Sequence, residues 1–233
     1  MIQLNEGNVF TMRHTILAAR SAALRIATFS FAAFCGLTFS AVAQATLLPV
    51  GAAIPSSGVP GLAGGGILVA NTGALPFVSP TFTGTLQSEA FLNDPANPFG
   101  PGNITFTYLI TNTNGPDSID RFTVNGYGVP GLVTDASYQA PTAGVLPASF
   151  DRSVAATLGD VIGVSYVDAP LGFGTLLPGS ASALVVVHTN SPLFGLSTAA
   201  VIDSTTTSVA ALAPLATVPE PSTIVLGLIG LAG

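Results

Sequence analysis

The sequence predicts an all-β protein, a single antiparallel β-sandwich. Charged residues make up 7% of the chain, against about 25% in typical globular proteins. Short segments in which apolar and polar residues alternate are separated by clusters of Gly, Pro, Asn and Asp. Strands at this spacing, with no helical periods between them, indicate antiparallel sheets packed face to face.

The expected strands begin at residue 82. Residues 82–88 alternate as far as Gly84, and residues 104–110 alternate throughout, with Ile104, Phe106 and Tyr108 on one face. The other expected strands are 122–126, 161–167, 184–187, 199–202 and 208–212. Turns are predicted at 93–95, 98–102, 112–117, 129–131 and 177–179, because Pro fixes φ while Gly and Asn accept positive φ.

The composition divides the chain into a domain and its flanks. The strands place the sandwich domain at residues 67–212. Residues 46–66 are rich in Gly and Pro, which predicts an irregular arm. Residues 213–218 are expected to form a short linker.

Residues 1–45 have the ordered parts of a secretory signal peptide. Three of the five basic residues of the chain come first: Arg13, Arg20 and Arg25. An uncharged segment, 26–42, follows, and Ala43-Gln44-Ala45 has the small residues of a cleavage site at Ala43 and Ala45. We therefore expect Sec-type export machinery and signal peptidase as partners and a mature chain that begins near Thr46. An uncleaved membrane anchor is the alternative.

Two further residues of this segment affect the interpretation. The start of the chain is unusually polar for a signal peptide, and initiation at Met12 would leave a conventional one. Cys35, the one cysteine of the chain, lies in the apolar segment after Phe34, whereas a lipoprotein signal needs a small residue there. Removal of the signal would leave an exported chain without thiols or disulfides.

The charge of the mature region excludes two classes of partner. Residues 46–218 contain no Lys, two arginines (Arg121 and Arg152) and nine acidic residues. Binding to nucleic acid depends on Lys and Arg that neutralise phosphates, and membrane-surface binding depends on polybasic segments. Neither mode fits this composition.

The end of the chain carries the most specific motif. Val218-Pro219-Glu220-Pro221-Ser222-Thr223 precedes an apolar run of Leu, Ile and Gly. It resembles the PEP-CTERM sorting signal of bacterial proteins that an exosortase processes. The resemblance implies sorting through Pro219, Glu220 and Pro221, delivery to the cell surface or extracellular matrix, and association with extracellular polysaccharide or biofilm.

The match departs from the family at its end. In the family the apolar run continues into a full transmembrane helix and a cluster of arginines, whereas this sequence stops at Gly233. We therefore expect residues 219–233 to be an incomplete signal that contains the start of the helix. Residues 82–86, 104–112, 117–121 and 178–190 also resemble domains of that family, for which no biochemical activity is implied.

The mature region offers little material for catalysis, and we expect no catalytic residues. Its one histidine, His188, follows an apolar strand, and no G-x-S-x-G motif accompanies it. Asp117 with Asp120, or Asp151 with Asp160, could supply the two carboxylates of a glycosidase. The chain has no Trp to stack on a sugar, and aspartates in loops more often form turns.

A calcium loop is the remaining candidate. Asn112, Asn114 and Asp117 place oxygen ligands at alternating positions, but the bidentate Glu of an EF-hand is missing. A turn explains the same residues, so no cofactor or metal is expected. Three classes stay open: a noncatalytic surface protein, a carbohydrate- or calcium-binding module, and a secreted hydrolase.

Overall fold

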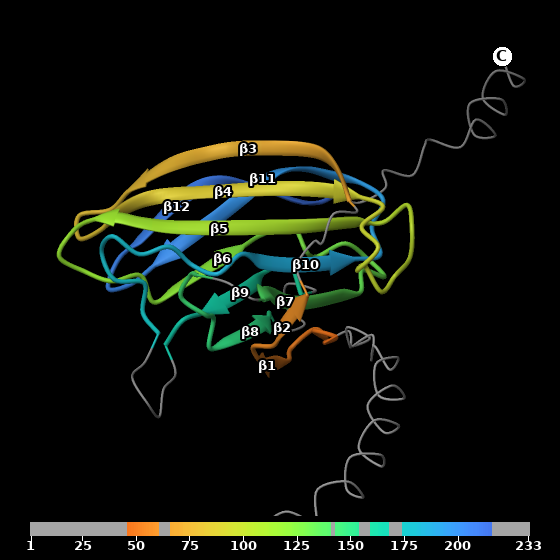
Figure 1. Cartoon of the computed structure of the whole chain (residues 1–233), viewed down its shortest axis with the longest axis horizontal. Helices are drawn as coiled ribbons and strands as arrows, with labels where there is room; N and C mark the ends of the chain where they lie inside the picture. The colour runs from red at the N-terminus through yellow and green to blue at the C-terminus, as the bar shows by residue number, and fades with distance from the viewer. Residues whose placement is uncertain (1–45, 61–65, 141–142, 154–158, 168–173, 216–233) are drawn as a thin grey trace, which may run out of the picture. The chain divides into compact units, whose positions relative to one another are not determined.

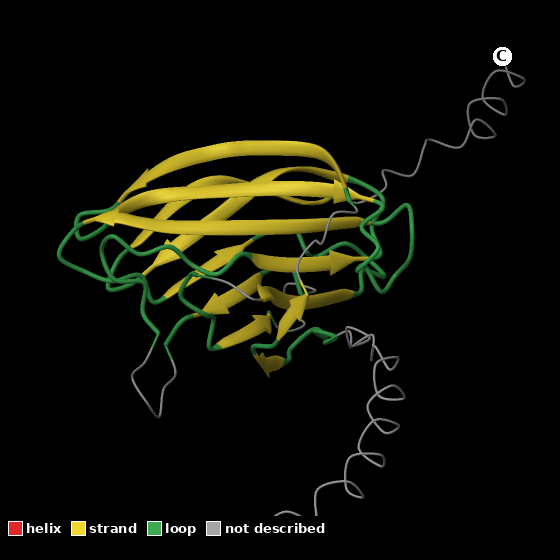
Figure 2. Cartoon of the chain, in the orientation of Figure 1, coloured by secondary structure: helices red, strands yellow, loops and turns green. Residues whose placement is uncertain are grey.

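All regular structure in the described part of the chain is β-strand. The computed structural model describes residues 46–60, 66–140, 143–153, 159–167 and 174–215 (Figure 1). Figure 2 shows strands and loops in these residues and no helix. The strands are β1 (Ala53–Pro55), β2 (Gly58–Pro60), β3 (Ile67–Val78), β4 (Thr83–Leu92), β5 (Ile104–Asn114), β6 (Arg121–Val124), β7 (Thr134–Ala140), β8 (Ser149–Arg152), β9 (Ile162–Ser165), β10 (Val185–Thr189), β11 (Phe194–Ile202) and β12 (Thr206–Pro214). The all-β prediction is confirmed.

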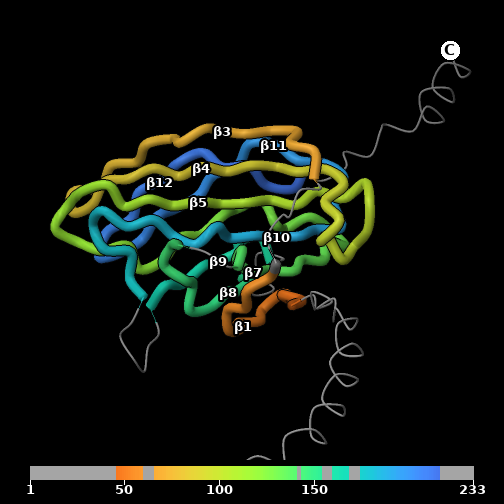
Figure 3. Tube along the Cα trace, viewed as in Figure 1, coloured from red at the N-terminus to blue at the C-terminus, as the bar shows by residue number. Residues whose placement is uncertain are grey.

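The strands form two six-stranded sheets. One sheet has the order β1-β8-β9-β6-β11-β12, and the other has the order β2-β7-β10-β5-β4-β3. In the second sheet, β3, β4, β5 and β10 run side by side, as the tube in Figure 3 shows. Every neighbouring pair is antiparallel except β2 and β7, which pair in parallel. The prediction of a purely antiparallel fold is wrong at this edge, because no tight turn joins β2 to β7 and sets their direction.

The core lies between the two sheets. On β5, Phe106, Tyr108 and Ile110 are fully buried in one cluster with Phe122 and Val201 of the opposite sheet. Phe122 contacts the ring of Tyr108 edge to face, with 6.1 Å between ring centroids. Burial of each such Phe contributes about 2 kcal/mol. Period-two alternation on β5 thus gives the face that the sequence predicts.

Two buried tyrosines link the sheets through polar atoms. The Tyr108 hydroxyl lies 2.6 Å from the Tyr127 hydroxyl and donates to the carbonyl oxygen of Leu212 at 2.7 Å. Each hydroxyl has one hydrogen, so Tyr127 must donate to Tyr108. Burial raises the pKa of both phenols, which keeps them neutral.

Several elements differ from the prediction. Two short strands, β1 and β2, lie inside the segment 46–66 that was expected to be irregular, and β12 extends through Pro214 into the expected linker. β3, β7 and β8 have no counterpart among the predicted strands. The sequence of β3 does not alternate regularly between apolar and polar residues, because its pairing with β4 contains two register shifts. Gly73 adopts a φ of 66° in this strand. β8 has only four residues, too few to show a period.

Candidate functional site

The candidate site is a small pocket on the outer face of the second sheet that is lined by both polar and apolar side chains. On β4, Gln87 and Glu89 alternate with Leu86 and Ala90, which are fully buried in the core. The two polar side chains therefore point away from the core. On β5, Thr107 pairs with Glu89 in the ladder and faces the same side. Alternation on two neighbouring strands brings these groups together.

Glu89 orients one amide of this pocket and a second amide beside it. Its Oε1 atom accepts hydrogen bonds from Nδ2 of Asn71 at 2.7 Å and from Nε2 of Gln87 at 2.9 Å. Asn71 comes from β3, so side chains of two neighbouring strands are oriented by one carboxylate. The pocket has a volume of about 170 Å³, and its apolar wall is formed by Leu109 and Leu184.

Thr107 adds a hydroxyl without a partner. Its side chain is 1% exposed, and its Oγ1 has no hydrogen-bond partner among the described residues. A buried polar atom without a partner costs about 1–3 kcal/mol. The residue lines the pocket, but this oxygen is itself buried, so a ligand hydroxyl would reach it only with movement of the neighbouring side chains and would then offset that cost.

His188 lies in a second polar cluster, which is sealed. It is near the end of β10, as the sequence predicts, and its ring is held between Asp135 of β7 and Asp94 of the loop after β4. The His188 Nδ1 atom is 2.8 Å from Oδ1 of Asp135. The Nε2 atom is 3.4 Å from Oδ2 of Asp94, an ion-pair contact without hydrogen-bond geometry. None of the three side chains is more than 3% exposed.

The cluster favours a charged histidine. Burial alone would lower the pKa of His188, but the hydrogen bond to Asp135 and the interactions with Asp94 outweigh it and raise the pKa above 6.5. Burial alone would raise the pKa of Asp94, but His188 and the backbone amide of Ala96 hold it below 3.8. The imidazolium thus stabilises two buried carboxylates.

This arrangement does not resemble a working catalytic triad. Asp135 occupies the position of the orienting acid, but Nε2 of His188 faces Asp94 and not a serine hydroxyl. A triad needs a nucleophile at that nitrogen. The burial of all three groups also keeps them from substrate.

The two candidate carboxylate pairs have other roles. Asp151 makes a bidentate ion pair with Arg121, with distances of 2.6 and 2.8 Å. Asp160 accepts hydrogen bonds from the amides of Gly126 and Gly128. The pKa of Asp120 is raised, first by burial and then by Asp203 and Asp117. The hydroxyls of Ser118 and Ser204 donate hydrogen bonds to Asp120 and Asp117, at 3.4 and 3.5 Å.

The candidate calcium loop is divided between strand and turn. Asn112 and Asn114 belong to β5, so the turn begins later than predicted. Asn112 is buried, and its Nδ2 donates to the carbonyl oxygens of Asp117 and Leu176. Asn114 is exposed, and its Oδ1 accepts from the amide of Gly115. Among the described residues, no group of three or more His, Cys, Asp or Glu is arranged to hold a metal ion.

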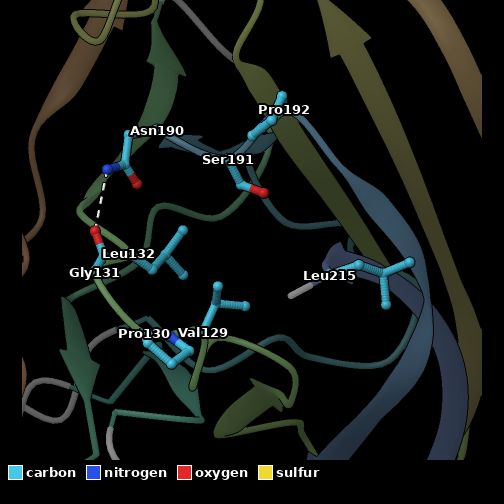
Figure 4. A pocket seen from close by; sticks show the side chains of 8 residues that line it. All are labelled: Val129, Pro130, Gly131, Leu132, Asn190, Ser191, Pro192 and Leu215. Atoms are coloured by element: carbon cyan, nitrogen blue, oxygen red, sulfur yellow. Dashed lines mark hydrogen bonds between the residues drawn. The ribbon is translucent and has the colours of Figure 1, made fainter. Parts of the chain in front are cut away.

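A shallow hollow lies at the end of the domain where the described chain stops. Figure 4 shows it between the loop at Val129–Leu132, the loop after β10 and Leu215. Asn190 joins the two loops, because its Nδ2 donates to the carbonyl oxygen of Gly131 and its Oδ1 accepts from the amide of Val133. Both polar ends of Asn190 are thus bonded within the protein.

The predicted processing sites cannot be placed. Ala43, Ala45, Pro219, Glu220 and Pro221 lie outside the described residues. Within the described ranges, no helix has the length and apolar character needed to cross a membrane.

The chain was compared with protein families, curated proteins and solved structures, and none of them matches it. The site must therefore be interpreted from its own chemistry.

Sequence reasoning did not find the Glu89 pocket. A signal was present, because Gln87 and Glu89 occupy alternate positions of a strand and a second polar alternation follows at residues 104–110. The contribution of Asn71 had no such signal, since β3 was not predicted.

Proposed function

We propose that the mature domain is a noncatalytic module that binds polysaccharide on the outer face of its second sheet. The observation that carries this is the pocket at Glu89. It combines a carboxylate, the amide of Gln87, the unpartnered hydroxyl of Thr107 and the leucines of its wall, and the amide of Asn71 lies beside it on the same carboxylate. A sugar presents hydroxyls at its rim and C–H groups on its ring face, and this pocket complements both.

The negative charge of the protein indicates which class of polysaccharide it can bind. The chain has a formal net charge of −6, and the pocket itself contains a carboxylate and no cation. An acidic polysaccharide would be repelled. Neutral polysaccharide is therefore the proposed partner.

A noncatalytic role agrees with the remaining groups. His188 is sealed between two carboxylates, and Asp151 is paired with Arg121. A hydrolase is the less supported alternative, since neither group is free to act on a bond.

The binding proposal can be tested by affinity electrophoresis of the full chain through gels that contain neutral or acidic polysaccharides, with and without calcium. Neutral glycans should retard the protein without calcium. Glu89→Ala should abolish the retardation, because it removes the acceptor that orients Asn71 and Gln87. Asp203→Asn removes a carboxylate elsewhere and should have no effect. Retardation by no glycan, or equal retardation of Glu89→Ala, would contradict the proposal.

We also propose that the chain is exported and then sorted by an exosortase to the cell surface or matrix, on the resemblance of residues 218–233. The test uses a host with an exosortase and a chain extended by an apolar span and arginines. Mass spectrometry of the surface fraction should find an N-terminus near Thr46 and a C-terminus near Pro219–Pro221. An intact tail that is unaffected by Glu220→Ala would show that the motif is not a sorting signal.

A further inference from the structure

Arg152, the last residue of β8, is a buried cation whose hydrogen-bond partners among the described residues are all uncharged. It is 4% exposed. Its Nε, Nη1 and Nη2 atoms donate to the carbonyl oxygens of Gly159, Leu132 and Tyr127, at 3.0, 3.1 and 2.7 Å. Carbonyl oxygens accept hydrogen bonds but do not neutralise a positive charge. Buried arginines are rare unless they are paired.

No carboxylate of the described residues compensates this charge. The ion pairs found there join Arg121 to Asp151, and His188 to Asp94 and Asp135. Asp160 is near in sequence, but its Oδ1 accepts from two backbone amides. Burial lowers the pKa of Arg152, which reflects the cost of an unpaired charge in the protein interior.

The guanidinium also has donors left over. It has five N–H groups, and three hydrogen bonds to described residues use one hydrogen on each nitrogen. One hydrogen on Nη1 and one on Nη2 are not used by the part of the chain that the structure describes. Two N–H groups on adjacent nitrogens match the two oxygens of a carboxylate.

Arg152 lines a pocket of about 250 Å³ between the start of the described chain and the segment before β7. The wall is apolar, and three of its side chains are 41–51% exposed: Leu47, Val50 and Val133. The hydroxyl of Thr134, which also lines the pocket, donates to the carbonyl oxygen of Leu48 at 3.0 Å. The hydroxyl of Thr134 has therefore used its hydrogen, whereas the guanidinium of Arg152 still has N–H groups that can donate to a ligand.

Val50 and Arg152 are neighbours across Gly159. A Cβ added to Gly159 would lie 2.6 Å from Cγ2 of Val50 and 2.7 Å from Nε of Arg152. Gly159 also has a φ of 73°, which favours glycine. The absence of a side chain at this position lets the apolar wall and the guanidinium come close together.

We propose that this pocket binds a small apolar carboxylic acid, of the class of medium-chain fatty acids. The carboxylate lies on the free N–H groups of Arg152 and supplies the missing negative charge. The alkyl chain covers Leu47, Val50 and Val133, which otherwise expose apolar surface. The volume is below the usual range of small-molecule pockets, about 300–1,000 Å³, and this favours a short chain.

The ligand is tested by isothermal titration of the full chain with octanoate, octanol and octylamine. These probes share the alkyl chain and differ in the head group. Octanoate should bind saturably. Octanol should bind at least about tenfold more weakly than octanoate because it lacks the negative charge. Octylamine should not bind. Equal binding of octanol would show an apolar patch only, and the absence of octanoate binding would make Arg152 purely structural. Either result overturns the proposal.

The location is tested by variants. Val50→Asp places a carboxylate in the pocket and should abolish octanoate binding, whereas Val69→Asp on β3, at a valine of similar exposure (38% against 44%), should not. Arg152→Lys keeps the positive charge but loses the planar guanidinium with its paired N–H groups, and it should weaken octanoate binding about tenfold. If Arg152→Lys fails to fold, Val50→Asp decides, because Val50 is at the surface. Octanoate binding that survives in a folded Val50→Asp variant would refute this location. The site is separate from the Glu89 pocket, so failure of one proposal leaves the other standing.

Discussion

Nδ1 of His188 lies 2.8 Å from Oδ1 of Asp135, and neither side chain exposes more than 3% of its surface. The two residues face each other on neighbouring strands, β10 and β7. Asp94 approaches the opposite nitrogen of the ring. Two buried carboxylates around one imidazole are stable only while the imidazole carries a proton. The stability of the fold should therefore depend on pH.

The free energy of unfolding should be highest between pH 3.8 and 6.5, the ordinary pKa values of Asp94 and His188. The folded pKa of His188 is raised, so its contribution is complete below pH 6.5 and is lost as pH rises through the folded value. The pKa of Asp94 is lowered, so its contribution is present above pH 3.8 and is lost as pH falls through the folded value. Urea unfolding at a series of pH values measures the loss of stability on the acid side and on the alkaline side.

His188→Gln should remove the decline on the alkaline side. At pH 6 it should cost about 3 kcal/mol or more, because it leaves two buried carboxylates without a cation. Near pH 9 the variant and the natural chain should differ much less. A natural chain whose stability is constant from pH 6 to 9, or a variant with the same slope, would refute this role of His188.

The two buried tyrosines should differ in their response to loss of the hydroxyl. Tyr108→Phe removes the donor to Leu212 and the acceptor for Tyr127, which leaves two buried groups unpaired and should cost about 3 kcal/mol. Tyr127→Phe leaves the bond from Tyr108 to Leu212 in place and should cost about 1 kcal/mol. Chemical denaturation gives both values. Equal costs would show that the hydrogen-bond direction is not the one inferred.

Gly163 of β9 lets the side chain of Arg121 cross the strand to Asp151. A Cβ at this position would overlap Nη2 of Arg121 and lie 2.6 Å from Oδ2 of Asp151. Gly163→Ala should therefore displace this partly exposed ion pair, at a cost of about 1 kcal/mol. The cost should largely vanish in an Arg121→Ala background, which a double-mutant cycle measures.

Gly84→Ala provides the contrast. There a Cβ would overlap the backbone carbonyl oxygen of Thr111 and the ring of Phe77. Backbone atoms and a buried ring cannot move aside as the end of an arginine can, so this change should cost about 3 kcal/mol. A Gly163→Ala variant as unstable as Gly84→Ala would contradict the interpretation.

Thr107→Val should make the domain more stable and its glycan binding weaker. Val has nearly the same shape and removes a buried hydroxyl that lacks a partner, which should gain about 1 kcal/mol. The same change removes a group of the Glu89 pocket. Ser137→Ala is the matched control, because Ser137 of β7 is also buried with an unpartnered hydroxyl but does not line the pocket. Thermal unfolding and gel retardation measured on both variants separate the two effects, and unchanged glycan binding in Thr107→Val would count against the proposed site.

The sequence by itself determined the properties that depend on local order and composition. Alternation placed Phe106 and Tyr108 on one face of a strand, and both are in the core. Asn in a predicted turn accepts positive φ, and Asn93 has a φ of 56°. The scarcity of cations predicts, from composition alone, that nucleic acid is not a partner. Such properties follow from the residue types themselves and from neighbours along the chain, whose geometry those types restrict.

Only the tertiary structure decided which polar groups meet. Asp94 reaches His188 from the loop after β4. His188 meets Asp135, and Glu89 meets Asn71, through the registers of strand ladders, and β7 and β10 of the first pair are far apart in the sequence. A register shift of one residue would turn each of these side chains to the other face of its sheet. Arg152 shows the same limit, because its three acceptors come from loops that carry no motif. Long-range pairing is set by the packing of the whole domain, and a local pattern does not contain that information.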